Sequence, residues 1–552
     1  MTANSLKAYV LLICAGVIQA FAICSPFTGL TRGWLSVLSL GIFLALLESN
    51  RSKSEPSNSE ELKTLGDIKR KFTYSFIFST SWLASSFWWI YISLYVYGGM
   101  PSVLATASVI ILASGLALYY TSVCVLYTLF SKKMGWVLLS VLFGALWTLA
   151  ELARAQWFTG FPWGAIGYAH LDDTLKLLAP YIGVYGIGFI AATIACLLAQ
   201  IGTNLIGKLS AKRRWTEKWN VISALGLCVA LLLIVAPNEG LIKLIEEKTQ
   251  QNLRLTDNLS YTLLQGNIPQ EIKFEAQGLS ALSWYREQIL AAKGQLIVTP
   301  ETAVPLLKID LPKGYWQEIK DHFKEKDHIK QALLIGIVGK EGKEYANSVV
   351  GINRNGEDFL YNKHHLVPFG EFIPAWFKWF TDLMHIPLGS FKRGELEQLP
   401  WKWEDQSYAV NICYEDVFGE EMAIPFNVEN VEMPTVMINV SNIGWFGPFW
   451  AVEQHLNASR MRAIEMRRPM LRATNTGATA AIDHNGYVKN LLVKGEAAVL
   501  NGEIRGVVGP KTPYASWSGK YSLYPLWVGC MGILFLALGI NFKISKAKIA
   551  KK

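Results

Sequence analysis

The sequence predicts a polytopic α-helical membrane domain that carries a large α/β domain outside the cytoplasm. Three observations lead to this fold class: a low charged fraction, a series of long apolar stretches, and one long segment in which short apolar runs alternate with helical patterns. Hydrophobic residues make up 51% of the 552 residues, and charged residues only 17%. This composition is not that of an ordinary soluble protein.

About eight stretches have the length and composition of a transmembrane helix, which needs about 20 apolar residues. We place them near residues 8–25, 29–48, 73–97, 102–130, 135–153, 177–206, 219–236 and 522–541. Buried helices of a large soluble protein are the alternative, but too many uncharged runs follow one another. For the first run, a cleaved signal peptide is a second interpretation, because small residues stand at Ala20 and Ala22.

Lysine and arginine gather in every second loop. The loops after the second, fourth and sixth spans and the C-terminal tail are rich in these residues, whereas the loops between them carry few. Positive charge on short loops marks the cytoplasmic side. Both termini and a polar linker at 49–71 are therefore expected in the cytoplasm, and the long insert after the seventh span outside it. Because the net charge of +9 is distributed in this way, we do not expect nucleic-acid binding.

The chain is expected to fall into three parts. Residues 1–238 contain spans one to seven, residues 239–518 form the extracytoplasmic domain, and residues 519–552 contain the last span and a basic tail. Within the insert, strands are expected at 261–266, 295–301, 332–339, 348–356, 408–415, 435–442 and 470–483, and helices at 276–293, 314–328 and 451–468. This alternation indicates an α/β layered domain.

The loop between the fifth and sixth spans is unusually aromatic. It contains Trp157, Phe158, Phe161, Trp163 and Tyr168 among several glycines. Because Trp and Tyr favour the membrane interface, an interfacial belt is one interpretation. The other is a wall of a lipid-binding site, and composition does not decide between them.

Only one cysteine, Cys413, lies in the extracytoplasmic segment. The other six lie in the apolar spans: Cys14, Cys24, Cys124, Cys196, Cys228 and Cys530. In an oxidising compartment cysteines are usually paired, and Cys413 has no partner in its own domain. It is therefore either a small buried residue or a working thiol.

Three short motifs at predicted strand ends supply complementary chemistry. Glu301 lies in "TPETAVP", Lys363 begins "KHHLVPFGE", and Cys413 lies in "NICYED". Singly, these residues are explained as a turn cap, a surface charge and a core residue. Together, a carboxylate can take the thiol proton, and a lysine can lower the thiol pKa and stabilise an oxyanion. The backbone N–H of Tyr414 is a natural second oxyanion donor.

No histidine is required by this chemistry. His364, His365 and His455 show no metal-ligand spacing, and adjacent strand residues point to opposite faces. We therefore expect neither a metal nor another cofactor.

The order Glu–Lys–Cys on an α/β domain resembles the nitrilase, or carbon–nitrogen hydrolase, superfamily, whose fold is an α-β-β-α sandwich. The strings at 363–371, at 411–415 and from Trp445 to Gly477 extend this resemblance. With spans on both sides and "TGFPW" at 159–163, the chain resembles the apolipoprotein N-acyltransferase family of Gram-negative inner membranes over nearly its full length.

This resemblance implies acyl transfer through a thioester. Cys413 would attack a glycerophospholipid ester as the nucleophile, Glu301 would be the general base, and Lys363 would stabilise the oxyanion. Glu371, Tyr414 and Glu415 match further residues that the family needs. The acceptor would be the α-amine of the S-diacylglyceryl cysteine of an apolipoprotein. The resemblance places the catalytic domain in the periplasm, and we expect a monomer among membrane lipids.

Apolar loops are expected to cover the thioester and shield it from water. The candidate lid and substrate residues are Trp163, Phe274, Trp376, Trp445 and Phe446. Ordinary core or interface packing is the alternative for each of them. The chain departs from the family at Phe274 and at Thr299, where a Trp is common, which bears on the lid and on lipid preference.

An amidase and a transporter are the two alternative functions. A membrane-tethered amidase would use the same triad on small amides, but eight spans are excessive for a tether. A transporter with an extracytoplasmic binding domain would need ionisable groups along a path through the spans. Few are present, and Glu151 and Arg154 lie at the end of a span. A transporter would tolerate Cys413→Ala.

Overall fold

The computed structural model describes residues 3–49, 60–130, 134–209, 216–249, 253–269, 278–342, 344–368, 370–373, 391–448 and 450–549. The chain forms two compact units. The helical unit comprises Met1–Tyr91, Met100–Ile245 and Leu523–Lys552, and the sheet unit comprises Ile92–Gly99 and Glu246–Ser522.

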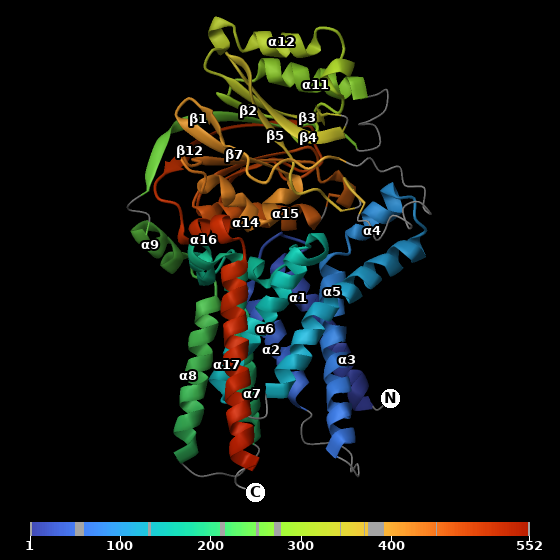
Figure 1. The fold of residues 1–552 in the computed structure, drawn as a ribbon, viewed down its shortest axis with the longest axis vertical. Helices are drawn as coiled ribbons and strands as arrows, with labels where there is room; N and C mark the ends of the chain where they lie inside the picture. The colour runs from blue at the N-terminus through green and yellow to red at the C-terminus, as the bar shows by residue number, and fades with distance from the viewer. Residues whose placement is uncertain are drawn as a thin grey trace. The chain divides into compact units, whose positions relative to one another are not determined.

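Each predicted span overlaps a helix of the helical unit (Figure 1). These helices are α1 (Ala3–Ile23), α2 (Gly33–Ser49), α3 (Glu60–Ser86), α5 (Ser102–Phe130), α6 (Trp136–Gln156), α7 (Ala179–Leu209), α8 (Thr216–Val235) and α17 (Tyr524–Ile549). Among the described residues, 5 helical stretches are long and apolar enough to cross a membrane. A sixth is added if the pair Gly226–Val235 and Glu239–Thr249, bent by 65°, is one span. The chain is a membrane protein, and the number of eight spans stays a prediction.

The third predicted span, 73–97, differs most from the structure. Helix α3 begins at Glu60, inside the predicted linker, and ends at Ser86. The chain then forms α4 (Ile90–Ile92) and a π-helix, η1 (Ser93–Tyr97). Residues 92–99 belong to the sheet unit, where the ring of Tyr97 packs edge-on against Trp445 at 5.2 Å. Tyr97 thus packs against protein, although Tyr95 and Val96 are exposed. Composition alone does not distinguish packing of this kind from contact with lipid.

Arg154 of α6 is wholly buried and holds the aromatic loop. Its guanidinium donates to the carbonyls of Phe161 at 2.7 Å and Trp163 at 2.6 Å, and to the Tyr120 hydroxyl at 2.9 Å. Trp163 is buried against Trp89, with 5.2 Å between ring centroids. Trp163 therefore packs inside the helical unit, whereas Trp157 and Phe158 of the same loop are exposed.

The sheet unit contains two six-stranded sheets, with strand orders β12-β1-β2-β3-β4-β5 and β11-β10-β9-β8-β7-β6. The first consists of β1 (Arg254–Gln265), β2 (Leu296–Val298), β3 (Ala332–Glu341), β4 (Glu344–Asn353), β5 (Gly356–Asn362) and β12 (Ala498–Val508). The second consists of β6 (Trp401–Trp403), β7 (Gln406–Ile412), β8 (Val436–Ser441), β9 (Met470–Thr474), β10 (Ala480–Ile482) and β11 (Val488–Leu491).

Helices cover the outer face of each sheet. Helices α11 (Gly278–Ala291) and α12 (Tyr315–His322) lie on the first, while α14 (Gly419–Met422), α15 (Ala451–Met466) and α16 (Pro513–Tyr521) lie on the second (Figure 1). One hydrophobic core lies between the sheets, where Leu263 and Val298 meet Ile438. Another joins Ile319 of α12 to the first sheet. The predicted α-β-β-α sandwich is confirmed.

The structure corrects several predicted elements. The expected strand 470–483 is two strands, β9 and β10, because a turn closed by Thr479 reverses the chain between them. The expected helix 314–328 ends at His322 and continues as 3₁₀ turns. Strands β5, β6, β11 and β12 were not expected, since their alternating or short apolar patterns are weak signals.

Strand direction brings the functional residues together. β1, β2 and β3 run parallel, as do β7, β8 and β9. The carboxyl ends of parallel strands meet at one edge of a sheet, where α/β proteins commonly bind ligands. Glu301 follows β2, while Cys413 and Asn442 follow β7 and β8.

Candidate active site

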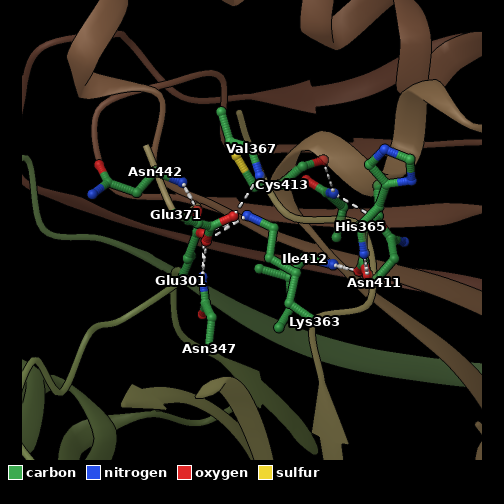
Figure 2. Close-up of polar contacts among 12 residues, drawn as sticks. Glu301, Asn347, Lys363, His365, Val367, Glu371, Asn411, Ile412, Cys413 and Asn442 are labelled. Atoms are coloured by element: carbon green, nitrogen blue, oxygen red, sulfur yellow. Dashed lines mark hydrogen bonds and ion pairs between the residues drawn. The ribbon is translucent and has the colours of Figure 1, made fainter. Parts of the chain in front are cut away.

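Glu301, Lys363 and Glu371 form a buried charged cluster beside Cys413 (Figure 2). Lys363 Nζ lies 3.1 Å from Glu301 Oε1 and 2.9 Å from Glu371 Oε1. The Lys363 side chain is only 1% exposed. The structure therefore brings together the three predicted catalytic residues and the predicted supporting residue Glu371.

Both carboxylate oxygens of Glu301 are held in place. Asn347 Nδ2 donates to Oε1 at 2.7 Å, and the backbone N–H of Asn442 donates to Oε2 at 2.8 Å. The loop that carries Glu301 packs against Gly336 of β3, where a Cβ would collide with the carbonyl of Pro300. A carboxylate fixed by three donors has one preferred orientation, as a positioned general base requires.

Glu371 holds the other side of Lys363. Its Oε1 also accepts a hydrogen bond from Asn347 Nδ2 at 2.8 Å, and its Oε2 accepts one from the Val367 backbone N–H at 2.8 Å. Burial lowers the pKa of Lys363, but the charges of Glu301 and Glu371 outweigh it and raise that pKa well above its usual value. Lys363 thus stays cationic and acts as a hydrogen-bond donor.

Cys413 lies at a sharp strand-to-helix turn. It directly follows β7 and begins the 3₁₀ helix η8 (Cys413–Val417) with φ +54°. A non-glycine residue in this left-handed region is strained, and such strain often occurs at functional sites. The residue as a whole is partly exposed, although its sulfur is buried.

The thiol of Cys413 is protonated at rest. Burial of the sulfur is the main cause that raises its pKa to about 12, and the charge of Glu301 raises it further. The positive charge of Lys363 lowers that pKa but does not offset the other two effects. A thiol of this kind attacks a carbonyl only if its proton is taken in the same step.

Glu415 connects the Cys413 turn to the segment that carries Lys363. Its carboxylate accepts hydrogen bonds from the backbone N–H groups of Ile412 at 2.6 Å, His364 at 2.6 Å and His365 at 3.1 Å. Burial raises the pKa of Glu415 to about 7, although these N–H donors oppose the rise. These hydrogen bonds therefore join the Cys413 turn to the Lys363 segment through the Glu415 carboxylate.

Tyr414 lies directly after the nucleophile and is buried. Its ring packs edge-on against Phe418 at 5.1 Å and lies near His365 at 5.7 Å. The predicted role of its backbone N–H as an oxyanion donor stays a prediction.

A second buried network lies beneath Cys413 and was not predicted from the sequence. His455 Nε2 lies 3.1 Å from the carbonyl oxygen of Cys413 and 2.8 Å from Asp416 Oδ1. Arg472 pairs with Asp416 Oδ2 at 2.9 Å and lies 2.7 Å from His455 Nδ1. Because an arginine can only donate, Nδ1 accepts and Nε2 carries the proton. His455 therefore donates toward the strained turn.

Other site residues were also missed. Asn347, Asn442, His455 and Arg472 come from four separate elements, and no local pattern joins them. The strings "QH" and "RATN" contain His455 and Arg472 and were the only sequence patterns that pointed to these two residues.

Thr299 accepts a hydrogen bond from the Gly336 backbone N–H at 3.0 Å, so it holds two strands together.

The lid candidates have different outcomes. Trp445 and Phe446 lie in the 3₁₀ helix η10 (Gly444–Phe446), which directly follows Asn442, and Trp445 is 41% exposed. Trp163 lies in the helical unit. Phe274 and Trp376 lie outside the described residues.

The sheet unit is similar to known proteins. The carbon–nitrogen hydrolase family model matches residues 262–509. A carbon–nitrogen hydrolase superfamily protein from Xanthomonas campestris aligns with 49% of this chain and 96% of its own, at 16% identity and a TM-score of 0.35. By its sequence match, the sheet unit is a domain of the carbon–nitrogen hydrolase class.

The similarity extends to the helical unit. The model of the apolipoprotein N-acyltransferase N-terminal domain matches residues 15–197. The apolipoprotein N-acyltransferase of Verminephrobacter eiseniae is 42% identical over 522 residues, or 92% of each chain. That of Ralstonia nicotianae is 37% identical over 490 residues, which cover 87% of this chain and 85% of the relative. The chain belongs to the apolipoprotein N-acyltransferase family.

Proposed function

We propose that this enzyme transfers a fatty acyl chain from a glycerophospholipid to the N-terminal S-diacylglyceryl cysteine of apolipoproteins, through a thioester at Cys413. Membership of the family across both units supports this function. The observation that carries the mechanism is the placement of Lys363 between Glu301 and Glu371, beside a protonated thiol. The amidase alternative is not favoured, because the relatives match both units.

In the first step, Glu301 takes the proton of the Cys413 thiol as the sulfur attacks the ester carbonyl carbon of the phospholipid. Lys363 Nζ and the Tyr414 backbone N–H donate to the oxyanion that develops. The carbon–oxygen ester bond then breaks. The alkoxide of the lysophospholipid takes the proton from Glu301 and leaves.

In the second step, the α-amine of the diacylated cysteine attacks the thioester carbon and loses its proton to Glu301. The same donors stabilise the second oxyanion. The carbon–sulfur bond breaks, and the Cys413 sulfur regains a proton from Glu301. The product is an amide, so the lipoprotein carries three acyl chains and the enzyme returns to its resting state.

The charge pattern supports an orientation of the enzyme in the membrane. The basic loops support a sheet unit in the periplasm with both chain termini in the cytoplasm. We further propose that the enzyme acts as a monomer in the bacterial inner membrane, because the described residues of one chain already hold the triad and its supporting carboxylates together. Trp445 and Phe446 would cover the thioester while it awaits the amine.

The thioester is tested by intact-mass measurement. Purified protein is incubated with phospholipid alone, as wild type, as Cys413→Ala, and as Cys530→Ala, a buried thiol of the last helix. The added mass of one acyl chain is expected on wild type and Cys530→Ala only. A diacylated lipopeptide should remove it and gain an amide-linked chain. No adduct on active wild type, or release of free fatty acid in place of acylated peptide, would contradict the proposal.

A further inference from the structure

A group of metal-ligating side chains lies on the turn between α12 and β3, which takes no part in the mechanism. We call residues 322–328 the histidine turn. The backbone N–H of Glu325 donates to the carbonyl of His322 at 3.3 Å, and that of His328 donates to Glu325 at 3.0 Å. Side chains three residues apart eclipse in such 3₁₀ turns. The ligand atoms of His322, Glu325 and His328 accordingly all lie within 4.8 Å of one another.

A buried glutamine sets the orientation of His328. Gln331 Nε2 donates to the carbonyls of Ala292 and Gly294, both at 3.0 Å, so its Oε1 faces the imidazole. That oxygen lies 2.6 Å from His328 Nδ1. Because Oε1 can only accept, Nδ1 carries the proton, and the lone pair of Nε2 is free to bind a metal. A carbonyl that fixes a histidine in this way is typical of metal sites.

His322 supplies an independent observation. The residue is only 8% exposed, and its Nε2 is buried with no hydrogen-bond partner among the described residues. Its ring stacks on His328, with 3.9 Å between centroids. A buried polar nitrogen without a partner is costly and calls for an explanation, and a bound cation would satisfy it.

We propose that the histidine turn binds one divalent transition-metal cation through the imidazoles of His322 and His328 and the carboxylate of Glu325. Two nitrogen ligands and one oxygen ligand suit Zn²⁺, with water as the fourth ligand. Glu325 is exposed, so the cation enters from solvent. The site joins the end of α12 to the start of β3 and is structural, not catalytic. It is independent of the proposed function.

Zinc binding is measured by calorimetry on the full-length protein in detergent, after removal of any affinity tag and dialysis against a chelator. Wild type is expected to bind one equivalent at this site. His328→Ala and Glu325→Gln should weaken the affinity at least about tenfold. Asp327→Asn, an acidic neighbour outside the cluster, should leave it unchanged. Zinc should also raise the thermal unfolding temperature of wild type but not of His328→Ala.

The outcomes are decisive in both directions. Equal zinc affinity in wild type and Glu325→Gln would overturn the three-ligand site, and so would the lack of a saturable equivalent on folded wild type. Since Glu325 is exposed, its substitution cannot fail merely through misfolding. Acyl transfer should be the same with and without zinc, so failure here leaves the proposed function untouched.

Discussion

The charge of Glu301 has two opposite effects on Cys413. It raises the pKa of the thiol, yet we propose Glu301 as the group that takes the thiol proton. A residue that only activated the thiol electrostatically would lower that pKa. The sign of the effect on the thiol pKa therefore distinguishes a general base from a charged residue that only lowers the pKa of the nucleophile.

Glu301→Gln should therefore speed alkylation of Cys413 by iodoacetamide while it prevents thioester formation. Without the negative charge, the thiol pKa falls from about 12 and the thiolate fraction near neutral pH rises. Site-specific mass spectrometry of alkylation against pH measures the first effect, and acyl-adduct formation the second. Slower alkylation would contradict the effect of the Glu301 charge on the thiol pKa, and an undiminished adduct would remove Glu301 as the base.

Glu415 and its backbone donors offer another test at this scale. The N–H groups of Ile412, His364 and His365 point at one carboxylate, and Glu415→Gln replaces one acceptor oxygen with an NH₂ group. A buried donor left unpaired costs about 1–3 kcal/mol. We expect a lower unfolding temperature and slower thioester formation, whereas Glu404→Gln at an exposed turn should change neither. Unchanged rates would limit Glu415 to a packing role.

At the scale of elements, Arg472 of β9, His455 of α15 and Asp416 of η8 join three elements below the nucleophile. Arg472→Met leaves the Asp416 carboxylate buried without its cation, which costs about 3–5 kcal/mol. Arg505→Met, at an exposed arginine of β12, should cost under about 1 kcal/mol. Denaturant unfolding measures both. A similar decrease in the free energy of unfolding for the two variants would show that the buried ion pair stabilises the fold no more than an exposed arginine does.

The contact between η1 and η10 is a further prediction for elements. Tyr97 packs against Trp445, and Gly447, at φ +74°, lies where a Cβ would meet Ile92. A double-mutant cycle of Tyr97→Ala and Trp445→Ala, read as kcat/KM for acyl transfer, should give a coupling of about 0.5–1.5 kcal/mol. Tyr95→Ala in place of Tyr97→Ala is the matched control. Additive effects at Tyr97 would mean that η1 does not hold the Trp445 loop.

For the whole molecule, the charge pattern predicts topology. Green fluorescent protein fused after Lys552 should fluoresce, because it would fold in the cytoplasm. Alkaline phosphatase inserted in the exposed loop between β11 and β12 near Gly495 should be active, since it needs an oxidising compartment. The reverse result would invert the proposed orientation while leaving the family assignment intact.

The sequence was sufficient to predict the architecture and to single out Glu301, Lys363 and Cys413, which the structure places together. Apolar length locates membrane helices, and strand ends carry Glu301, Lys363 and Cys413. It was insufficient where distant residues meet. Nothing local connects Asn347 to Glu371, and the pattern of 92–99 does not tell packing against Trp445 from contact with lipid. The 3₁₀ turns after α12 also bring His322 next to His328. The predicted continuous α-helix over 314–328 would not place these two side chains together.

The high pKa of Cys413 has a consequence beyond catalysis. Peroxide oxidation and disulfide exchange both require the thiolate. A thiol that is protonated between turnovers resists conversion to sulfenic acid and mixed disulfides in the oxidising surroundings that we propose for the sheet unit. The buried site that makes Cys413 dependent on Glu301 would thus also protect an unpaired cysteine from oxidation in that compartment.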